Sequence, residues 1–264
     1  MKITLIQYDI AWANGKANHD TCERMIIDAP GADVYVLPEM FSTGFATDPD
    51  GIAEKMEDGM CASLAWMQLM ADRQDAAIVG SVAVKDAEGK YRNRLYFVKP
   101  DGEVAYYDKH HLFTYGNEHV RYSAGEKRTI VEWRGMKFLL QVCYDLRFPV
   151  FSRNAIADSS KDAMYDCCIY VANWPESRRK VWDALLMARA LENQCYVVGV
   201  NRVGDDNACH YNGGSAVIDA YGRVVGRVDD EQSATTMVSL DIEKLKAFRS
   251  KFPVLHDGDA ETAY

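Results

Sequence analysis

The sequence predicts an α/β protein with a four-layer αββα sandwich built from two similar halves. Short apolar runs bounded by turns alternate with segments of helical period, which is typical of this class. The order strand, helix, strand, helix and then hairpins occurs twice, with a break near residue 125. Two sheets that each carry helices on one face bury their other faces by packing together. We therefore expect a single domain over 1–264, with halves at about 1–125 and 126–240 and a C-terminal tail over 241–264.

The first half opens with two strands and two helices. Apolar runs predict buried strands at 3–7 and 34–37, and Glu39 follows the second of them. Apolar residues that recur on one face predict helices at 17–27 and at about 60–73. The Met-rich stripe of the second helix indicates core packing.

Three further apolar runs complete the first half. They lie at 77–84, 91–98 and 104–107, and turns that contain glycine join them, so they predict an antiparallel meander. The meander ends just before Lys109. The polar stretch 114–122 has neither a helical nor a strand period, and we expect it to be a loop over the site.

The second half repeats this order. Apolar runs predict strands at 129–133, 136–142, 168–171, 196–200, 215–219, 223–228 and 236–240. The helical period of 179–194 predicts a long helix, and we expect another helix after Pro149. A short helix from Ile242 and a polar tail end the chain.

Charge and hydropathy argue against binding to nucleic acid or to a membrane. The 264 residues carry a formal net charge of −9, and phosphate binding needs a basic surface, so we expect no nucleic-acid partner. No apolar run approaches the roughly 20 residues of a membrane span, so we expect no membrane association. A strand predicted from Ile3 leaves no room for a signal peptide.

The cysteines point to a reducing compartment. There are seven, an odd number that cannot all pair, and none has CxxC spacing. Cys209-His210 is the nearest approach to a metal-binding pair, but it lacks a matching second pair. We therefore expect a cytoplasmic protein with reduced thiols, without a metal or a cofactor.

Cys143 is the candidate nucleophile. It follows the apolar run 138–142, so its thiol is predicted at the end of a buried strand. There it lies close to backbone N–H groups and to the positive end of the next helix, and both favour the nucleophilic thiolate. The alternative is a buried cysteine that packs as a small apolar residue.

Residues upstream of Cys143 favour the catalytic interpretation. Glu39 and Lys109 also follow strands, so three chemically active side chains stand at strand ends. With them come the motifs Pro-Glu-Met-Phe at 38–41, Tyr-Asp-Lys-His at 107–110 and Cys-Tyr-Asp-Leu-Arg-Phe-Pro at 143–149. This set resembles the nitrilase superfamily of carbon–nitrogen hydrolases.

The resemblance covers nearly the whole chain. It includes the layout in two halves and the segment Ala-Asn-Trp-Pro at 172–175. Within the superfamily, residues 109–113 and 143–148 are most similar to omega-amidases.

The resemblance implies a role for each residue of the set. A thiol with a pKa of about 8.5 is mostly protonated at neutral pH, so Cys143 needs a base, and the resemblance assigns that task to Glu39. Lys109 and the backbone N–H of Tyr144 would stabilise the oxyanion that forms when sulfur attacks an amide carbon. Glu118 matches a second glutamate of the superfamily and would position Lys109 or the substrate. Its alternative is a solvated loop carboxylate.

Arg147 and Trp174 are candidate substrate-binding residues. A dicarboxylic acid monoamide keeps a free carboxylate at its far end, and Arg147 could supply the cation that meets it. The alternative for Arg147 is an ion pair with Asp145. Trp174 follows a predicted strand and would line the pocket, unless it is simply buried in the core.

Other reactive side chains compete with this set. Core packing is favoured for three other cysteines. Cys195 lies at a helix-to-strand junction without an acidic or basic neighbour in sequence. Cys167-Cys168 opens a strand, and a redox-active pair is the alternative there. His110 and His111 suggest a Cys–His dyad. The resemblance leaves the role of base to a glutamate.

The sequence therefore predicts an amidohydrolase that releases ammonia from the terminal amide of a small dicarboxylic or 2-oxo acid monoamide. The substrate class is that of 2-oxoglutaramate or 2-oxosuccinamate, and the reaction passes through a Cys thioester. A nitrile or N-carbamoyl amide hydrolase shares the Glu-Lys-Cys set and is an alternative. A noncatalytic interaction module is a third. We expect the amide and water as partners, and a homodimer or higher homo-oligomer in which Phe148, Phe151 and Trp182 are candidate contacts.

Overall fold

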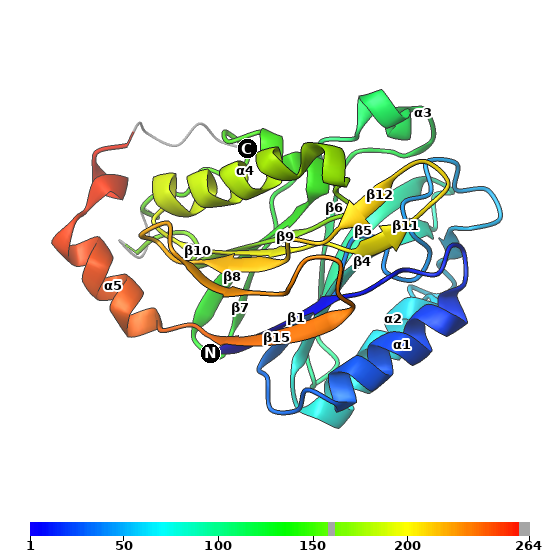
Figure 1. The fold of residues 1–264 in the computed structure, drawn as a ribbon, viewed down its shortest axis with the longest axis horizontal. Helices are drawn as coiled ribbons and strands as arrows, with labels where there is room; N and C mark the ends of the chain where they lie inside the picture. The colour runs from blue at the N-terminus through cyan, green and yellow to red at the C-terminus, as the bar shows by residue number, and fades with distance from the viewer. Residues whose placement is uncertain (158–161, 259–264) are drawn as a thin grey trace.

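The computed structural model describes residues 1–157 and 162–258, and these residues form four layers (Figure 1). Two β-sheets lie face to face in the middle. Helices α1 (Gly15–Ile27) and α2 (Ala62–Gln74) cover the outer face of one sheet, and α4 (Arg179–Glu192) covers the outer face of the other. The predicted αββα sandwich is confirmed.

The first sheet follows the order β15, β1, β2, β4, β5, β6, with the short β3 paired to β4. Its strands are β1 (Lys2–Gln7), β2 (Val34–Val36), β3 (Glu54–Lys55), β4 (Ala77–Lys85), β5 (Tyr91–Val98), β6 (Val104–Asp108) and β15 (Ala234–Ser239). Strands β1, β2 and β4 run parallel, and β4, β5 and β6 form the predicted antiparallel meander.

The second sheet follows the order β14, β13, β10, β9, β8, β7. Its strands are β7 (Ile130–Trp133), β8 (Met136–Val142), β9 (Cys167–Val171), β10 (Tyr196–Val200), β13 (Ala216–Ile218) and β14 (Val224–Arg227). The central strands β8, β9 and β10 run parallel. A separate hairpin of β11 (Val203–Asp205) and β12 (His210–Asn212) was not predicted from the sequence.

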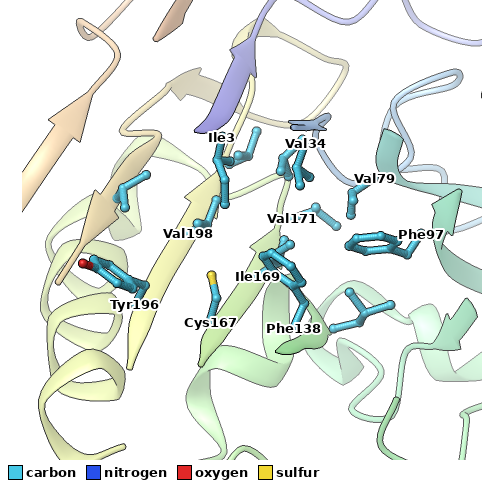
Figure 2. Packing of buried hydrophobic residues seen from close by; sticks show 14 of the residues in the cluster. Ile3, Val34, Val79, Phe97, Phe138, Cys167, Ile169, Val171, Tyr196 and Val198 are labelled. Carbon is cyan, nitrogen blue, oxygen red and sulfur yellow. The ribbon is translucent and has the colours of Figure 1, made fainter. Parts of the chain in front are cut away.

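The main core lies between the two sheets. Figure 2 shows its buried side chains, which meet from the two sheets and include Ile3, Val34, Val79 and Phe97 on one side and Phe138, Ile169, Val171 and Val198 on the other. Burial of these apolar faces is the main favourable term that holds the halves together. The inter-sheet packing also fixes how strand ends of the first sheet lie relative to those of the second.

The last predicted strand belongs to a different sheet from the one expected. We predicted that 236–240 completes the second half, but β15 pairs antiparallel with β1, with Lys2 opposite Ser239. Without β15, the edge of β1 would expose a row of backbone N–H and C=O groups that lack hydrogen-bond partners. Strand β15 supplies these partners. The chain thus crosses from the second half back to the first before α5 (Ile242–Lys251).

The helix predicted after Pro149 is absent from 150–157 and 162–166, and the remainder of that region lies outside the described residues. Backbone groups in this segment form isolated turns, such as Ser152 N–H to the Pro149 carbonyl at 3.2 Å, or bond to other segments. The N–H of Asn154 donates to Asn193 Oδ1 at 2.8 Å, and its side-chain amide donates to the Tyr165 carbonyl at 3.0 Å. A polar side chain that competes for backbone groups in this way disfavours a helix.

The stretch 114–122 is not a plain loop. It contains a 3₁₀ turn, η1 (Thr114–Gly116), and a single helical turn, α3 (Glu118–Arg121). Asn117 joins them with φ of 60°, a left-handed conformation that asparagine tolerates. Elements this short show no period in a sequence. Two further 3₁₀ turns, η3 (Glu176–Arg178) and η4 (Val254–His256), were missed for the same reason.

Helix ends and hydropathy complete the description. The side chain of Asn14 accepts from the Ala17 N–H at the start of α1, and Asp241 accepts from the Lys244 N–H at the start of α5. Within the described residues, no helix combines the length and the apolar character needed to cross a bilayer.

Gly199 in β10 tests the packing of α4 on the second sheet. A Cβ added there would lie 2.6 Å from Leu186 Cδ1 and 2.8 Å from Trp182 Cζ2, both in α4. We expect Gly199→Ala to lower the free energy of unfolding by about 1–3 kcal/mol, measured by urea denaturation, because overpacking forces the helix to shift. Gly15→Ala is the control, since its Cβ would meet only the Ser42 carbonyl at 3.8 Å. Equal stability of the two variants would contradict the tight packing.

Candidate active site

The candidate catalytic residues lie where strands of both sheets end. Glu39 comes after β2, Lys109 directly follows β6, and Cys143 directly follows β8. In open α/β sheets, ligand sites form outside the carboxyl ends of the strands. The two sheets therefore present their reactive side chains at a shared edge.

Lys109 forms ion pairs with two glutamates inside the protein. Its Nζ lies 2.9 Å from Glu39 Oε1 and 2.9 Å from Glu118 Oε2, and all three side chains are fully buried. Burial lowers the pKa of Lys109, but the carboxylates of Glu118 and Glu39 outweigh it and hold that pKa well above its ordinary value. The ammonium is thus charged throughout the physiological range. Glu118 is a buried partner of this lysine, so the alternative of a solvated loop carboxylate is wrong.

Two asparagines hold the glutamates in place. The amide Nδ2 of Asn93 donates to Glu39 Oε1 at 2.8 Å and to Glu118 Oε1 at 3.2 Å. The backbone N–H of Asn173 donates to Glu39 Oε2 at 2.9 Å, and its side-chain amide donates to the Glu39 carbonyl at 2.6 Å. Phe113 adds a backbone N–H to Glu118 Oε2 at 2.6 Å. Neither carboxylate can rotate without losing several hydrogen bonds.

The sequence reasoning did not find Asn93. It lies in β5 and is almost fully buried. Asn93 stands between Arg92 and Arg94, so no local pattern in the sequence marks its side chain as buried. In the structure it finds hydrogen-bond partners inside the protein, as a buried polar group must. Asn173 was noted only as part of a segment that resembles the superfamily.

Cys143 begins the 3₁₀ turn η2 (Cys143–Arg147) and has φ of 45°. Met40, directly after Glu39, also has φ of 45°. Left-handed backbone is costly for residues with a Cβ and is concentrated at functional sites. The Cys143 Sγ lies 3.9 Å from the Asn173 carbonyl, and the thiol hydrogen-bonds to Glu39.

The surroundings of Cys143 favour its protonated thiol over the thiolate, which is the opposite of the net effect that we expected from backbone N–H groups and the next helix. Burial raises the pKa of Cys143 well above its ordinary value, and Glu39 raises it further, whereas Lys109 lowers it. One ammonium faces two carboxylates at this position. A base must therefore accept the proton of this thiol before its sulfur can attack as a thiolate.

Asp145 anchors η2 to its surroundings. Its carboxylate accepts from the Val142 N–H at 2.9 Å, from the Tyr107 hydroxyl at 2.8 Å and from the His111 N–H at 2.9 Å. The ring of His111 also contacts Asp145, at 2.8 Å from Nδ1, so this histidine is a structural partner and not the base for the thiol. The predicted alternative of an Arg147–Asp145 ion pair is wrong, because Asp145 has these partners instead.

A cavity of about 530 Å³ opens over Cys143. Its walls include the aromatic side chains of Trp12, Phe45, Phe113, Tyr115, Tyr144, Trp174 and Tyr211. Arg147 also lines it, and its guanidinium carbon lies 5.1 Å from the centre of the Trp174 ring. Both predicted substrate-binding residues therefore lie in the cavity wall, and the predicted position of 114–122 over the site is confirmed for Tyr115 and Gly116.

Arg178 was not singled out by the sequence reasoning. It lines the same cavity from η3, and its guanidinium carbon lies 5.4 Å from the centre of the Phe113 ring. Its position, three residues after the Trp-Pro pair that follows β9, was the available signal.

Three other cysteines and two of the candidate subunit contacts are buried core residues. Cys167, Cys168 and Cys195 are buried in the cores, as predicted. Phe151 and Trp182 are buried within the monomer, so they cannot be contacts between subunits. Across residues 1–157 and 162–258, no group of three or more His, Cys, Asp and Glu side chains is placed to hold a metal ion.

Comparison with known proteins defines the family. The model of the carbon–nitrogen hydrolase family matches residues 2–250, so the chain belongs to this family, as the resemblance implied. The omega-amidase YafV of Yersinia enterocolitica is 45% identical over 98% of this chain and 97% of its own length. The 2-oxoglutaramate amidase of Bacillus subtilis is 34% identical over 97% of this chain and 96% of its own length.

A solved structure supports the same conclusion. A CN-hydrolase superfamily protein from Xanthomonas campestris, crystallised with an arsenic adduct in its active site, matches with a TM-score of 0.95. It is 41% identical, and the match covers 100% of this chain and 99% of that one.

Glu39→Gln tests the electrostatics of the cluster. The substitution removes a carboxylate that raises the pKa of Cys143 and leaves the Lys109 ammonium that lowers it. We therefore expect the Cys143 thiolate to form at lower pH in this variant than in the wild type. Thiolate absorbance near 240 nm, followed against pH and corrected with matching Cys143→Ser proteins, measures the shift.

Glu132→Gln is the control for this measurement, because Glu132 lies exposed on β7 and outside the cluster. An unchanged or raised pKa of Cys143 in Glu39→Gln would show that Glu39 does not govern the thiol.

Proposed function

We propose that this protein is a thiol-dependent omega-amidase, which hydrolyses the terminal amide of a small dicarboxylic or 2-oxo acid monoamide to the acid and ammonia. The observation that carries the proposal is the buried cluster of Glu39, Lys109 and Glu118 beside the thiol of Cys143. The relatives named omega-amidase and 2-oxoglutaramate amidase support the substrate class.

The first half-reaction forms a thioester. Glu39 takes the proton of the Cys143 thiol, and Sγ attacks the amide carbon while the carbonyl electron pair moves onto oxygen. The Lys109 ammonium and the backbone N–H of Tyr144 stabilise this oxyanion. That N–H lies in the first turn of η2, where backbone donors have no partner within the helix.

The thioester forms when the C–N bond breaks. Protonated Glu39 gives its proton to the departing nitrogen, and ammonia leaves. Glu39 then takes a proton from water, and the resulting hydroxide attacks the thioester carbon. Collapse of this second tetrahedral intermediate releases the acid and the Cys143 thiolate, which regains its proton from Glu39. One carboxylate serves both half-reactions.

Glu118 is a positioning residue in this scheme. It pairs with Lys109 alongside Glu39 and is itself fixed by Asn93 and the Phe113 N–H. Burial raises the pKa of Glu118, and Lys109 opposes this. Because these contacts fix Glu118, it keeps the Lys109 ammonium in the same orientation when Glu39 gains and loses its proton.

Arg147 and Trp174 support an acid amide over a simple nitrile as the substrate. Arg147 forms no ion pair with any carboxylate among the described residues, and it lies in a cavity with largely apolar walls. A cation in such a place favours a ligand with a free carboxylate. Trp174 supplies the flat surface against which the guanidinium packs.

We also propose that the protein works in the cytoplasm as a homodimer or higher homo-oligomer. All seven cysteines are free thiols, and a reducing compartment keeps Cys143 active. Exposed apolar side chains of α4 and of the segment after α5, Met187, Leu191 and Phe252, are candidates for a subunit contact.

Cys143→Ala is expected to abolish ammonia release from 2-oxoglutaramate while the circular dichroism spectrum stays that of the wild type, because the change removes a single buried atom. The wild type is compared on 2-oxoglutaramate, butyronitrile and N-carbamoyl-β-alanine, with ammonia as the readout. We expect the amide to be turned over best. Activity retained in Cys143→Ala, or turnover of the nitrile alone, would overturn the proposal.

A further inference from the structure

We propose that Arg178 is a specificity-determining residue that binds the 2-oxo group of the substrate, so that the enzyme prefers 2-oxo acid monoamides to plain dicarboxylic monoamides. The inference rests on the proposed function, because it assigns one end of the substrate to a particular side chain. The location of Arg178 and the pairing of the other charges in the cavity support it.

Arg178 is held at the cavity wall by its neighbours. The indole Nε1 of Trp174 donates to the Arg178 carbonyl at 2.8 Å, which closes the turn after β9. The guanidinium packs over Phe113, and the pKa of Cys209, another residue of the cavity wall, is lowered by Arg178 against the larger effect of burial. The positive charge of Arg178 thus acts inside the cavity.

The same indole positions the second cation. The Arg147 guanidinium lies over the Trp174 ring, while the Trp174 N–H is bonded to the Arg178 backbone. One tryptophan therefore organises two arginines that come from different segments, η2 and η3. This arrangement gives one binding site with two guanidinium groups.

The acidic residues of the cavity wall are already paired. Asp48 and Asp50 both bind Arg121. Asp206 accepts from the Tyr211 hydroxyl at 2.6 Å and from the backbone N–H of Ala208 at 2.7 Å. The wall acids are thus held by other partners.

The two cations are not paired in this way. Within the part of the chain that the structure describes, neither Arg147 nor Arg178 has a carboxylate oxygen within 4.0 Å of its guanidinium nitrogens. Two uncommitted guanidinium groups among aromatic walls favour an anionic ligand with several acceptor atoms.

Two arginines suit a 2-oxo acid better than a plain carboxylic acid. A guanidinium binds the two oxygens of a carboxylate as a fork, and Arg147 makes that contact in the proposed function. A 2-oxo acid adds a third acceptor on the adjacent carbon, which a single fork leaves without a donor. Leaving a buried acceptor without a partner is unfavourable. Arg178 supplies that donor, whereas glutaramate carries a methylene at this position and does not need it.

The experiment compares matched pairs of ligands that differ only in the 2-oxo oxygen. For turnover these are 2-oxoglutaramate and glutaramate. For binding they are the product acids, 2-oxoglutarate and glutarate, titrated by calorimetry into Cys143→Ser protein. The variant is Arg178→Ala, with Arg178→Lys to retain a charge. Arg24→Ala on the exposed face of α1 is the control, and it should match the wild type on every ligand.

In Arg178→Ala we expect kcat/KM for 2-oxoglutaramate to fall by about 10- to 100-fold more than kcat/KM for glutaramate, mainly through KM. The preference for 2-oxoglutarate over glutarate in binding should shrink by a similar factor, and Arg178→Lys should restore part of it. Equal losses on both members of each pair, or no loss on either, would overturn the assignment. If the wild type hydrolyses neither amide, the proposed function fails, and the binding pair still tests Arg178 alone.

Discussion

The ion pairs that Lys109 forms with Glu39 and Glu118 are the interaction on which the rest of the site depends. One ammonium lies between two carboxylates, all without contact with solvent. Removing Lys109 would leave two carboxylates inside the protein without a counter-charge, which is strongly unfavourable. Burial raises the pKa of the neighbouring Cys143 thiol, the carboxylate of Glu39 raises it further, and Lys109 opposes both. The same three charged side chains therefore influence both the arrangement of the site and the pKa of Cys143.

The sandwich is what brings these charges together. Glu39 and Lys109 come from the first sheet and Cys143 from the second, so the distances between these three side chains are set by how the two sheets pack. Asp145 ties the nucleophile's turn to the segment that follows Lys109, across the boundary between the halves. A rigid inter-sheet core thus serves as the support that a preorganised site requires.

Much of this was predictable from apolar runs and from the residues that end them. Most strands, the helices α1, α2 and α4, and the positions of Glu39, Lys109 and Cys143 at strand ends follow from local pattern. A pattern of buried residues does not say which strand is its neighbour, so β15 was assigned to the wrong sheet. Asn93 and the raised pKa of Cys143 depend on groups distant in sequence, and a local period carries no such information. The place of Arg178 after the Trp-Pro pair is visible in the sequence, but whether its charge has a carboxylate partner depends on the fold.

The most direct test is to trap the covalent intermediate. The account places the acyl group on the sulfur that faces Glu39 and Lys109. Trypsin releases that sulfur in the peptide 138–147, which contains one cysteine. Wild-type enzyme is acid-quenched during turnover of 2-oxoglutaramate, digested at mildly acidic pH and examined by mass spectrometry. We predict an acyl mass increment on this peptide that disappears once the substrate is exhausted. An acyl group on another residue, or turnover with this peptide unmodified at every quench time, would contradict it.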